Sequence, residues 1–194
     1  MSSLAANTYA GVITHTDSFS FGSTTIFDQE YSNNNNAITT QTNTTSLNIA
    51  GFDSNLGILT GVEISFDTNW LLSGKIEGWD TRNSRWHPEY VKGAGIATSK
   101  MQVTLTNPAS STEDKISATT SSCHKWGKKS AYCTKSESTS GSFNDTLDLS
   151  TIALSNFLDT MLILEFEKKL TAEVTKCETW FSNDDKCRMT NYNN

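Results

Sequence analysis

The chain has 194 residues, a formal net charge of −6 at pH 7 and a pI of about 5.0. This acidic balance argues against a nucleic-acid partner, because phosphate backbones attract basic proteins. The sequence contains no run of about 18 apolar residues and therefore predicts no membrane span. Its 36% hydrophobic and 10% aromatic content separates it from disordered chains, and we expect residues 1–194 to form a single domain.

Alternation of apolar and polar residues predicts a series of β-strands along the chain. In residues 59–67, Val62, Ile64 and Phe66 share one face, and the same alternation recurs in residues 100–107. Further elements are predicted in the remaining segments: strands at residues 11–16, 18–21, 46–49, 70–79, 116–120 and 145–149, and one helical turn at residues 153–158.

The clearest strand pattern spans residues 160–180. Between Leu162 and Lys176 the even-numbered positions are apolar except for Lys168, whereas the odd-numbered positions are mostly polar. Lys176 also interrupts the apolar face. Separately, we expect the strand to bend near the charged residues 167–169. Many strands with one apolar and one polar face indicate an all-β fold, namely an antiparallel two-sheet β-sandwich of jelly-roll-like form.

The block "FDSNLGILTGVEI", residues 52–64, resembles the "FDPSLGTL-x-x-V-x-L" signature of the choice-of-anchor E domains of exported bacterial proteins. The earlier segment "DSFSFGSTT" is similar to the opening F-x-F strand of that family, and residues 147–174 are similar to its closing half. The resemblance implies a secreted or cell-surface β-sandwich without an assigned activity. This chain departs from it in its four cysteines and five tryptophans. We expect an exported protein whose signal peptide and any anchor lie outside these residues.

Two segments share the cysteine spacing C-x2-W-x6-C, with Cys123, Trp126 and Cys133 in the first and Cys177, Trp180 and Cys187 in the second. Zinc ligands normally come in closer C-x2–4-C pairs, so this spacing favours two disulfide bonds in an exported protein. Pairing within each segment is favoured, because each pair can then close a local hairpin. A crossed pairing between the two segments is the alternative if they are neighbours.

The two cysteine segments also differ in charge. The first is basic, with His124 and Lys125 among its residues, whereas the second is net acidic, with Glu178 and Asp184. We expect the two tips to attract each other, either within one molecule or between copies in a head-to-tail self-association. Because exposed ion pairs contribute about 0–1 kcal/mol each, such an assembly would be sensitive to salt.

Aromatic residues are the main candidates for a binding site: Trp79, Trp86, Tyr90, Trp126 and Trp180. The first three lie close together in the chain, among Asp, Arg and Asn residues. Such a combination suits stacking on sugar rings and also suits protein interfaces. The alternative is that these tryptophans fold back onto the protein as a small satellite core.

Metal binding is a second possibility, and its candidate ligands are His15, His87 and His124. If these histidines converge they suit copper or zinc, although three scattered surface residues are the simpler interpretation. Asp53 and Asn55 are candidate calcium ligands. More simply, Asp53 caps the turn "DSNLG" and Gly57 ends it with a positive φ.

The sequence offers little support for catalysis. It contains neither a G-x-S-x-G nor an H-E-x-x-H motif, and the carboxylates of residues 165–173 are typical of a solvated strand face. We therefore assign no catalytic residue and no cofactor. The favoured function is a non-catalytic secreted or cell-surface module for structure, adhesion, or binding of a surface glycan or protein through exposed aromatics. An extracellular copper- or other metal-binding protein is the alternative, and a secreted hydrolase comes third.

Overall fold

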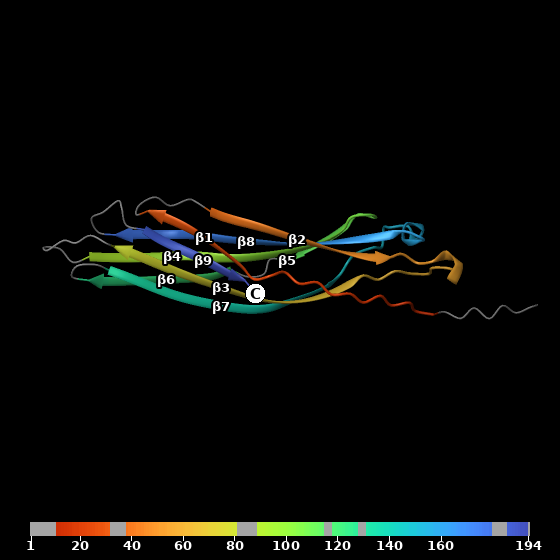
Figure 1. Ribbon diagram of the computed structural model, residues 1–194, viewed down its shortest axis with the longest axis horizontal. Helices are drawn as coiled ribbons and strands as arrows, with labels where there is room; N and C mark the ends of the chain where they lie inside the picture. The colour runs from red at the N-terminus through yellow and green to blue at the C-terminus, as the bar shows by residue number, and fades with distance from the viewer. Residues whose placement is uncertain are drawn as a thin grey trace, which may run out of the picture.

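The computed structural model describes residues 11–31, 38–80, 89–114, 118–127, 131–179 and 186–193, which form an elongated molecule (Figure 1). Sheet A contains, in spatial order, β1 (Thr24–Tyr31), β9 (Lys186–Asn193), β3 (Ser65–Asp80) and β7 (Ala131–Thr146). Sheet B contains β2 (Ile38–Ala50), β8 (Met161–Thr179) and β4 (Glu89–Leu105), and β4 also pairs with both β5 (Ser110–Asp114) and β6 (Ala118–Gly127). The predicted all-β fold of two antiparallel sheets is confirmed.

Strand β8 illustrates how the alternation in the sequence becomes an inner and an outer face. Its even-numbered side chains from Leu162 to Val174 are buried between the sheets, and Lys168 is buried among them. The register with β4 then shifts between Val174 and Lys176, where a β-bulge inserts one extra residue. Beyond the bulge the odd-numbered positions face inward. Cys177 is therefore buried, whereas Lys176 lies on the outer face.

Most other predicted strands coincide with observed strands, although their bounds differ. Residues 46–49 and 70–79 fall within β2 and β3, whereas residues 59–67, 100–107 and 145–149 are strands over part of their length. Of the predicted strand at residues 116–120, the described part, 118–120, falls within β6, and residues 116–117 lie outside the described residues. The register of β8 with both β2 and β4 is continuous at residues 167–169, where a bend is predicted, and its irregularity against β4 lies instead between Val174 and Lys176. Residues 153–158 contain the 3-10 helix η2 (Leu154–Phe157), as predicted.

The turn after β2 is the 3-10 helix η1 (Ser54–Leu56). Asp53 Oδ1 accepts hydrogen bonds from the backbone N–H of Asn55 at 2.9 Å and from its side-chain amide at 2.8 Å. Gly57 ends the turn with a φ of 143°, which a side chain would disfavour. The predicted roles of Asp53 as a cap and of Gly57 as the positive-φ residue are confirmed.

Two hydrophobic clusters lie between the sheets, one after the other along the length of the sandwich. The cluster that we call the disulfide half consists of Ile26, Leu72, Ile76, Val91, Ala97, Cys123, Ala131, Cys133, Leu170, Ala172, Val174, Cys177, Cys187 and Met189. The cluster that we call the aromatic half consists of Ile64, Met101, Val103, Leu105, Phe143, Leu147, Phe157, Leu162, Leu164 and Phe166. Trp70 packs against both clusters.

Residues 11–23, which we call the strap, cover the aromatic half. The strap does not form either of the two strands predicted for it. Instead, the Phe19 ring stacks on Phe166 with 3.7 Å between ring centroids, and Phe21 packs edge-on against Phe19 at 5.8 Å. The apolar alternation of the strap therefore packs two partly buried aromatic rings against the aromatic half without backbone pairing to a neighbouring strand.

The strap also covers Lys168, the charged residue on the inner face of β8. Lys168 Nζ donates a hydrogen bond to the Gly22 carbonyl at 3.3 Å and lies 5.1 Å from the centroid of the Phe21 ring. Burial lowers the pKa of Lys168, because desolvation disfavours the ammonium form. The carbonyl and the ring partly replace the water that this ammonium group gives up.

Candidate functional site

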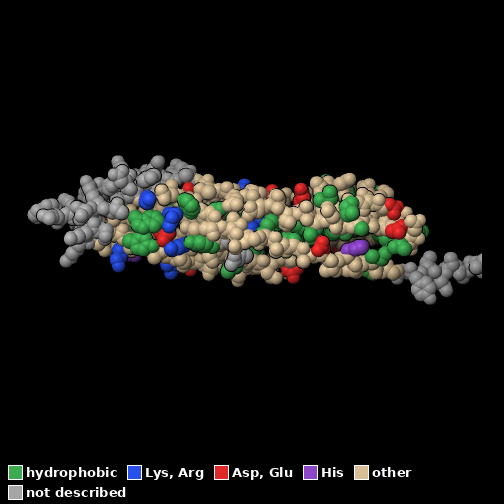
Figure 2. Space-filling model, viewed as in Figure 1, with side chains coloured by type: hydrophobic (Ala, Val, Ile, Leu, Met, Phe, Trp, Pro, Cys, Tyr) green, Lys and Arg blue, Asp and Glu red, His purple; other side chains and the backbone are tan. Residues whose placement is uncertain are grey.

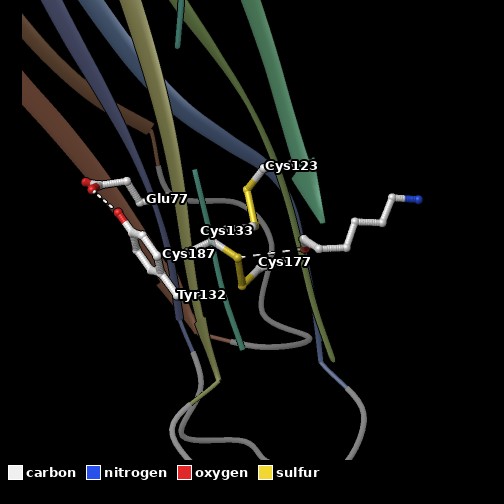
Figure 3. The surroundings of a disulfide bond; sticks show 7 residues. Glu77, Cys123, Tyr132, Cys133, Cys177 and Cys187 are labelled. Atoms are coloured by element: carbon white, nitrogen blue, oxygen red, sulfur yellow. Dashed lines mark hydrogen bonds between the residues drawn. A yellow bond between two sulfur atoms is a disulfide. The ribbon is translucent and has the colours of Figure 1, made fainter. Parts of the chain in front are cut away.

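Both disulfides lie between the two sheets, close to each other (Figure 3). Cys123 of β6 bonds to Cys133 of β7, and Cys177 of β8 bonds to Cys187 of β9, with 5.6 Å between the Cα atoms in each case. The predicted pairing is confirmed. However, each disulfide joins a strand of sheet B to a strand of sheet A, so the two segments are links between sheets rather than two-stranded hairpins. Two disulfides suggest an oxidising environment such as the outside of the cell.

One glycine in each sheet separates the two disulfides. In sheet A, Gly78 pairs with both Cys133 and Cys187, and in sheet B, Gly93 pairs with the other two cysteines. A Cβ atom at Gly78 would lie 2.7 Å from a Val91 methyl carbon and 3.2 Å from Cys133 Sγ. The central strands thus carry no side chain at this level, which leaves room for the sulfur atoms between the sheets.

The outer face of sheet A carries aromatic and charged side chains near this disulfide pair. We call this cluster the sheet A platform, and it consists of Phe27 on β1, Lys75, Glu77 and Trp79 on β3, Tyr132 on β7 and Arg188 on β9. The strand register brings them together, since Trp79 pairs with Tyr132 and Glu77 pairs with Arg188. Hydrophobic side chains flanked by lysine and arginine are visible at the left of Figure 2.

Glu77 is the centre of the hydrogen bonds in the platform. Its carboxylate accepts from the Tyr132 hydroxyl at 2.9 Å, from Lys75 Nζ at 2.7 Å and from Arg188 Nη2 at 2.8 Å. Figure 3 shows the Tyr132 hydroxyl directed at Glu77. Burial alone raises the pKa of this carboxyl, but the three hydrogen bonds outweigh burial and lower its pKa to about 2. The hydrogen bond to Glu77 in turn raises the pKa of Lys75.

The rings of the platform surround the Arg188 guanidinium. Its central carbon lies 5.2 Å from the Trp79 ring centroid and 5.7 Å from that of Phe27, within the range of cation–π contacts. Trp79 and Tyr132 are neighbours, with 5.8 Å between ring centroids. Phe27 remains 54% exposed and Tyr132 46% exposed. The platform therefore combines fixed side chains with aromatic surface that faces solvent.

The five aromatic residues predicted as a binding site do not form one surface. Trp79 belongs to the sheet A platform, whereas Tyr90 and Trp126 pair on sheet B, with 4.6 Å between their ring centroids. Trp126 is 50% exposed, so its side chain presents aromatic surface to solvent. Trp86 and Trp180 lie outside the described residues.

Sequence reasoning missed most of the platform: Phe27, Lys75, Glu77, Tyr132 and Arg188. Two of these residues had a usable signal, because Tyr132 precedes Cys133 and Arg188 follows Cys187 in the chain. Neighbours in a strand point to opposite faces, so a residue beside an inward cysteine must point outward. The contact between β1 and β9 that brings Phe27 to the platform had no local signal in the sequence.

The candidate metal ligands are separated. His15 is exposed in the strap, whereas His124 lies beside the Cys123–Cys133 disulfide, and His87 falls outside the described residues. Within the described part of the chain, no group of three or more His, Cys, Asp or Glu side chains is placed to hold a metal ion. Asp53, a candidate calcium ligand, caps η1 through its Oδ1 atom.

No protein-family model, curated protein or solved structure matches this chain. The resemblance to choice-of-anchor E domains therefore stays a prediction. Among the residues that the structure describes, no helix has the length and apolarity that a membrane span requires.

Proposed function

We propose that this protein is a non-catalytic module, exported to the cell surface or the medium, that binds a glycan through the sheet A platform. The observation that carries the proposal is the Glu77 carboxylate, which holds Tyr132 and Arg188 in place beside exposed aromatic rings. Sugar rings present flat C–H faces that stack on aromatic side chains, and their hydroxyl groups bond to charged side chains. A site fixed in advance binds with a smaller loss of side-chain entropy.

The state of Glu77 supports a binding role over a catalytic one. A general acid or base needs a pKa near the working pH, whereas the pKa of Glu77 is about 2. Its oxygens are also engaged by three donors from the protein itself. We therefore assign Glu77 to the positioning of its neighbours, and we propose no hydrolytic reaction on this face.

The compartment in this proposal rests on the disulfides and on the sequence resemblance. Disulfide bonds persist in secreted and surface proteins, whereas cytosolic thiols are kept reduced. The block at residues 52–64 resembles exported domains that are held at the cell surface by different anchors. A surface-located module with an open aromatic face is suited to adhesion.

Binding of the disulfide-bonded protein to a glycan array tests the proposal. If Tyr132 is a hot-spot residue of this interface, its truncation costs about 2 kcal/mol or more, so Tyr132→Ala is expected to weaken binding by about thirtyfold or more. Trp126→Ala is the matched control, since Trp126 is an equally exposed aromatic residue on the other sheet. Binding that is lost in Trp126→Ala and unchanged in Tyr132→Ala would place the site on sheet B and overturn the proposal.

A further inference from the structure

A shallow groove adjoins the sheet A platform along the seam between the two sheets. It has a volume of about 350 Å³ and lies where the edge strand β6 of sheet B faces the edge strand β7 of sheet A. Its lining consists of Ser122, Cys123, His124 and Lys125 from β6 and Tyr132, Cys133, Thr134 and Lys135 from β7. Tyr132 belongs both to this groove and to the platform, so the two surfaces are continuous.

The groove is lined by basic groups that are not fully neutralised. Lys125 is exposed and forms no ion pair within the described residues, and His124 beside it is exposed as well. Lys135 pairs with Glu137 at 2.9 Å, but both side chains remain about half exposed. The nearest platform carboxylate is Glu77, which is already shared between two cations. The groove therefore presents an excess of positive charge.

This local charge contrasts with the net charge of the whole protein, which is −6. Much of the acidic excess belongs to the opposite half of the sandwich and its loops: Asp53, Glu63, Asp67, Asp145, Asp148, Asp159, Glu165 and Glu167. In Figure 2, blue side chains gather toward the disulfide end and red ones appear mostly toward the other end. An anion that approaches this protein is accordingly favoured at the disulfide end.

We propose that the ligand of the platform is an anionic glycan, whose carboxylate or sulfate group binds in this groove. One sugar ring stacks on Tyr132, and the acidic group of the same or the next sugar contacts Lys125, His124 and Lys135. The stacking of a sugar ring on Tyr132 rests on the proposed function, whereas the binding of an anionic group in the groove is inferred from the groove-lining residues alone. Apart from Tyr132 and the two cysteines, the described residues that line the groove are polar or basic, so the groove itself favours a polar, charged group.

Dextran and dextran sulfate provide the test, because they share one sugar backbone and differ in charge. Affinity electrophoresis of the disulfide-bonded protein is expected to detect dextran sulfate at low salt, with much weaker retardation by dextran. Binding should weaken as added salt shortens the Debye length from about 10 Å at 0.1 M to about 3 Å at 1 M. Polygalacturonate extends the test to carboxylates, and polyglutamate tests an acidic chain that has no sugar ring.

Variants separate the groove from the platform. Lys125→Gln and Lys135→Gln are each expected to weaken dextran sulfate binding by about two- to fivefold, as for single exposed ion pairs. Lys169→Gln is the matched control, because Lys169 is an exposed lysine in the middle of β8, on the outer face of sheet B. Equal weakening by Lys169→Gln would mean that overall charge alone decides binding, and would overturn the inference.

The outcomes for the groove and the platform are distinct. Equal binding of dextran and dextran sulfate, with no effect of Lys125→Gln, overturns the anionic ligand and leaves the platform proposal standing. Binding that falls in Lys125→Gln but not in Tyr132→Ala supports the groove and overturns stacking on the platform. Polyglutamate that binds as tightly as polygalacturonate assigns the groove to acidic peptides instead of glycans. Binding to none of these polymers overturns the inference.

Discussion

The disulfide half and the aromatic half of the sandwich fill the space between their sheets with different side chains. Glycine, alanine and cysteine are frequent in the disulfide half. There, Gly78 of sheet A and Gly93 of sheet B lie on opposite sides of the two disulfide bonds. In the aromatic half, the space between the sheets is filled instead by larger side chains, among them Phe143, Phe157 and Phe166. Each phenylalanine buries about 150–250 Å², which a glycine cannot match. Covalent bonds thus supplement the stability that apolar burial supplies elsewhere, and they do so beneath the candidate binding surface.

The largest effect is expected from removing an aromatic ring in the aromatic half. Phe166→Ala leaves a cavity beneath the Phe19 ring and should lower the free energy of unfolding by about 3–5 kcal/mol. Chemical denaturation followed by tryptophan fluorescence measures this change. Phe27→Ala is the control, because Phe27 is exposed and should cost well under half as much. Equal costs would mean that the aromatic rings do not hold this half together.

Loss of one disulfide should have a slightly smaller effect on the other half. The double variant Cys177→Ser/Cys187→Ser opens a short covalent loop and should lower the free energy of unfolding by ~3 kcal/mol, chiefly by freeing the unfolded chain. Denaturation of the double variant and of the wild type, both without reducing agent, gives the difference. A double variant as stable as the wild type would show that burial alone stabilises the disulfide half.

A methyl group at Gly78 tests how closely the two sheets approach each other in the disulfide half. Gly78→Ala would place its Cβ against Val91 and both disulfides, and such overpacking typically costs about 1–3 kcal/mol. Gly61→Ala is the matched control, since a Cβ there meets no heavy atom within 4 Å. Thermal unfolding of the two variants should show a clear loss for the first and little change for the second. A neutral Gly78→Ala would contradict the close approach of the sheets.

The smallest effect on the free energy of unfolding is expected from Glu77, on the outer face of sheet A. The pKa of Glu77 is about 2 in the folded protein and 4.5 in its ordinary state, so this carboxylate stabilises the fold above pH 4.5. That contribution is lost progressively as the pH falls from about 4.5 toward 2. Glu77→Gln should therefore cost on the order of 1–2 kcal/mol at pH 7, with a difference from wild type that shrinks in acid. A difference that stays constant between pH 7 and pH 2 would contradict this role.

The strands were predictable wherever apolar and polar residues alternate, because that pattern depends on neighbouring residues alone. Strand β8 was found in this way, whereas the pairing of the cysteines within each segment was predicted from their repeated spacing. The bulge that turns Cys177 inward was not, since it is apparent only against the register of β4. Residues of the strap also alternate, yet they form no strand, because alternation records which side chains are buried and not whether the backbone is paired.

The candidate site was predictable only in part for the same reason. Trp79 was identified by its residue type, but its neighbours Phe27 and Arg188 lie far from it in the sequence. They meet through the strand order β1-β9-β3-β7, which no local pattern encodes. Glu77 was overlooked because a glutamate on an outer strand face is ordinarily solvated. Its burial depends on three donors, Lys75, Tyr132 and Arg188, two of which come from other strands.

The position of the two disulfides also determines how the molecule opens. Both disulfide bonds between the sheets lie in the disulfide half, so the two sheets are linked covalently near one end of the sandwich and not near the other. Local separation of the sheets should begin at the opposite end, where release of the strap exposes Phe166 and Lys168 to water. Hydrogen exchange should then be graded along the length of β8, with faster exchange near Leu162 than near Cys177. A protein pulled apart by force would lose its aromatic half first, while the surface proposed to hold the ligand stayed folded.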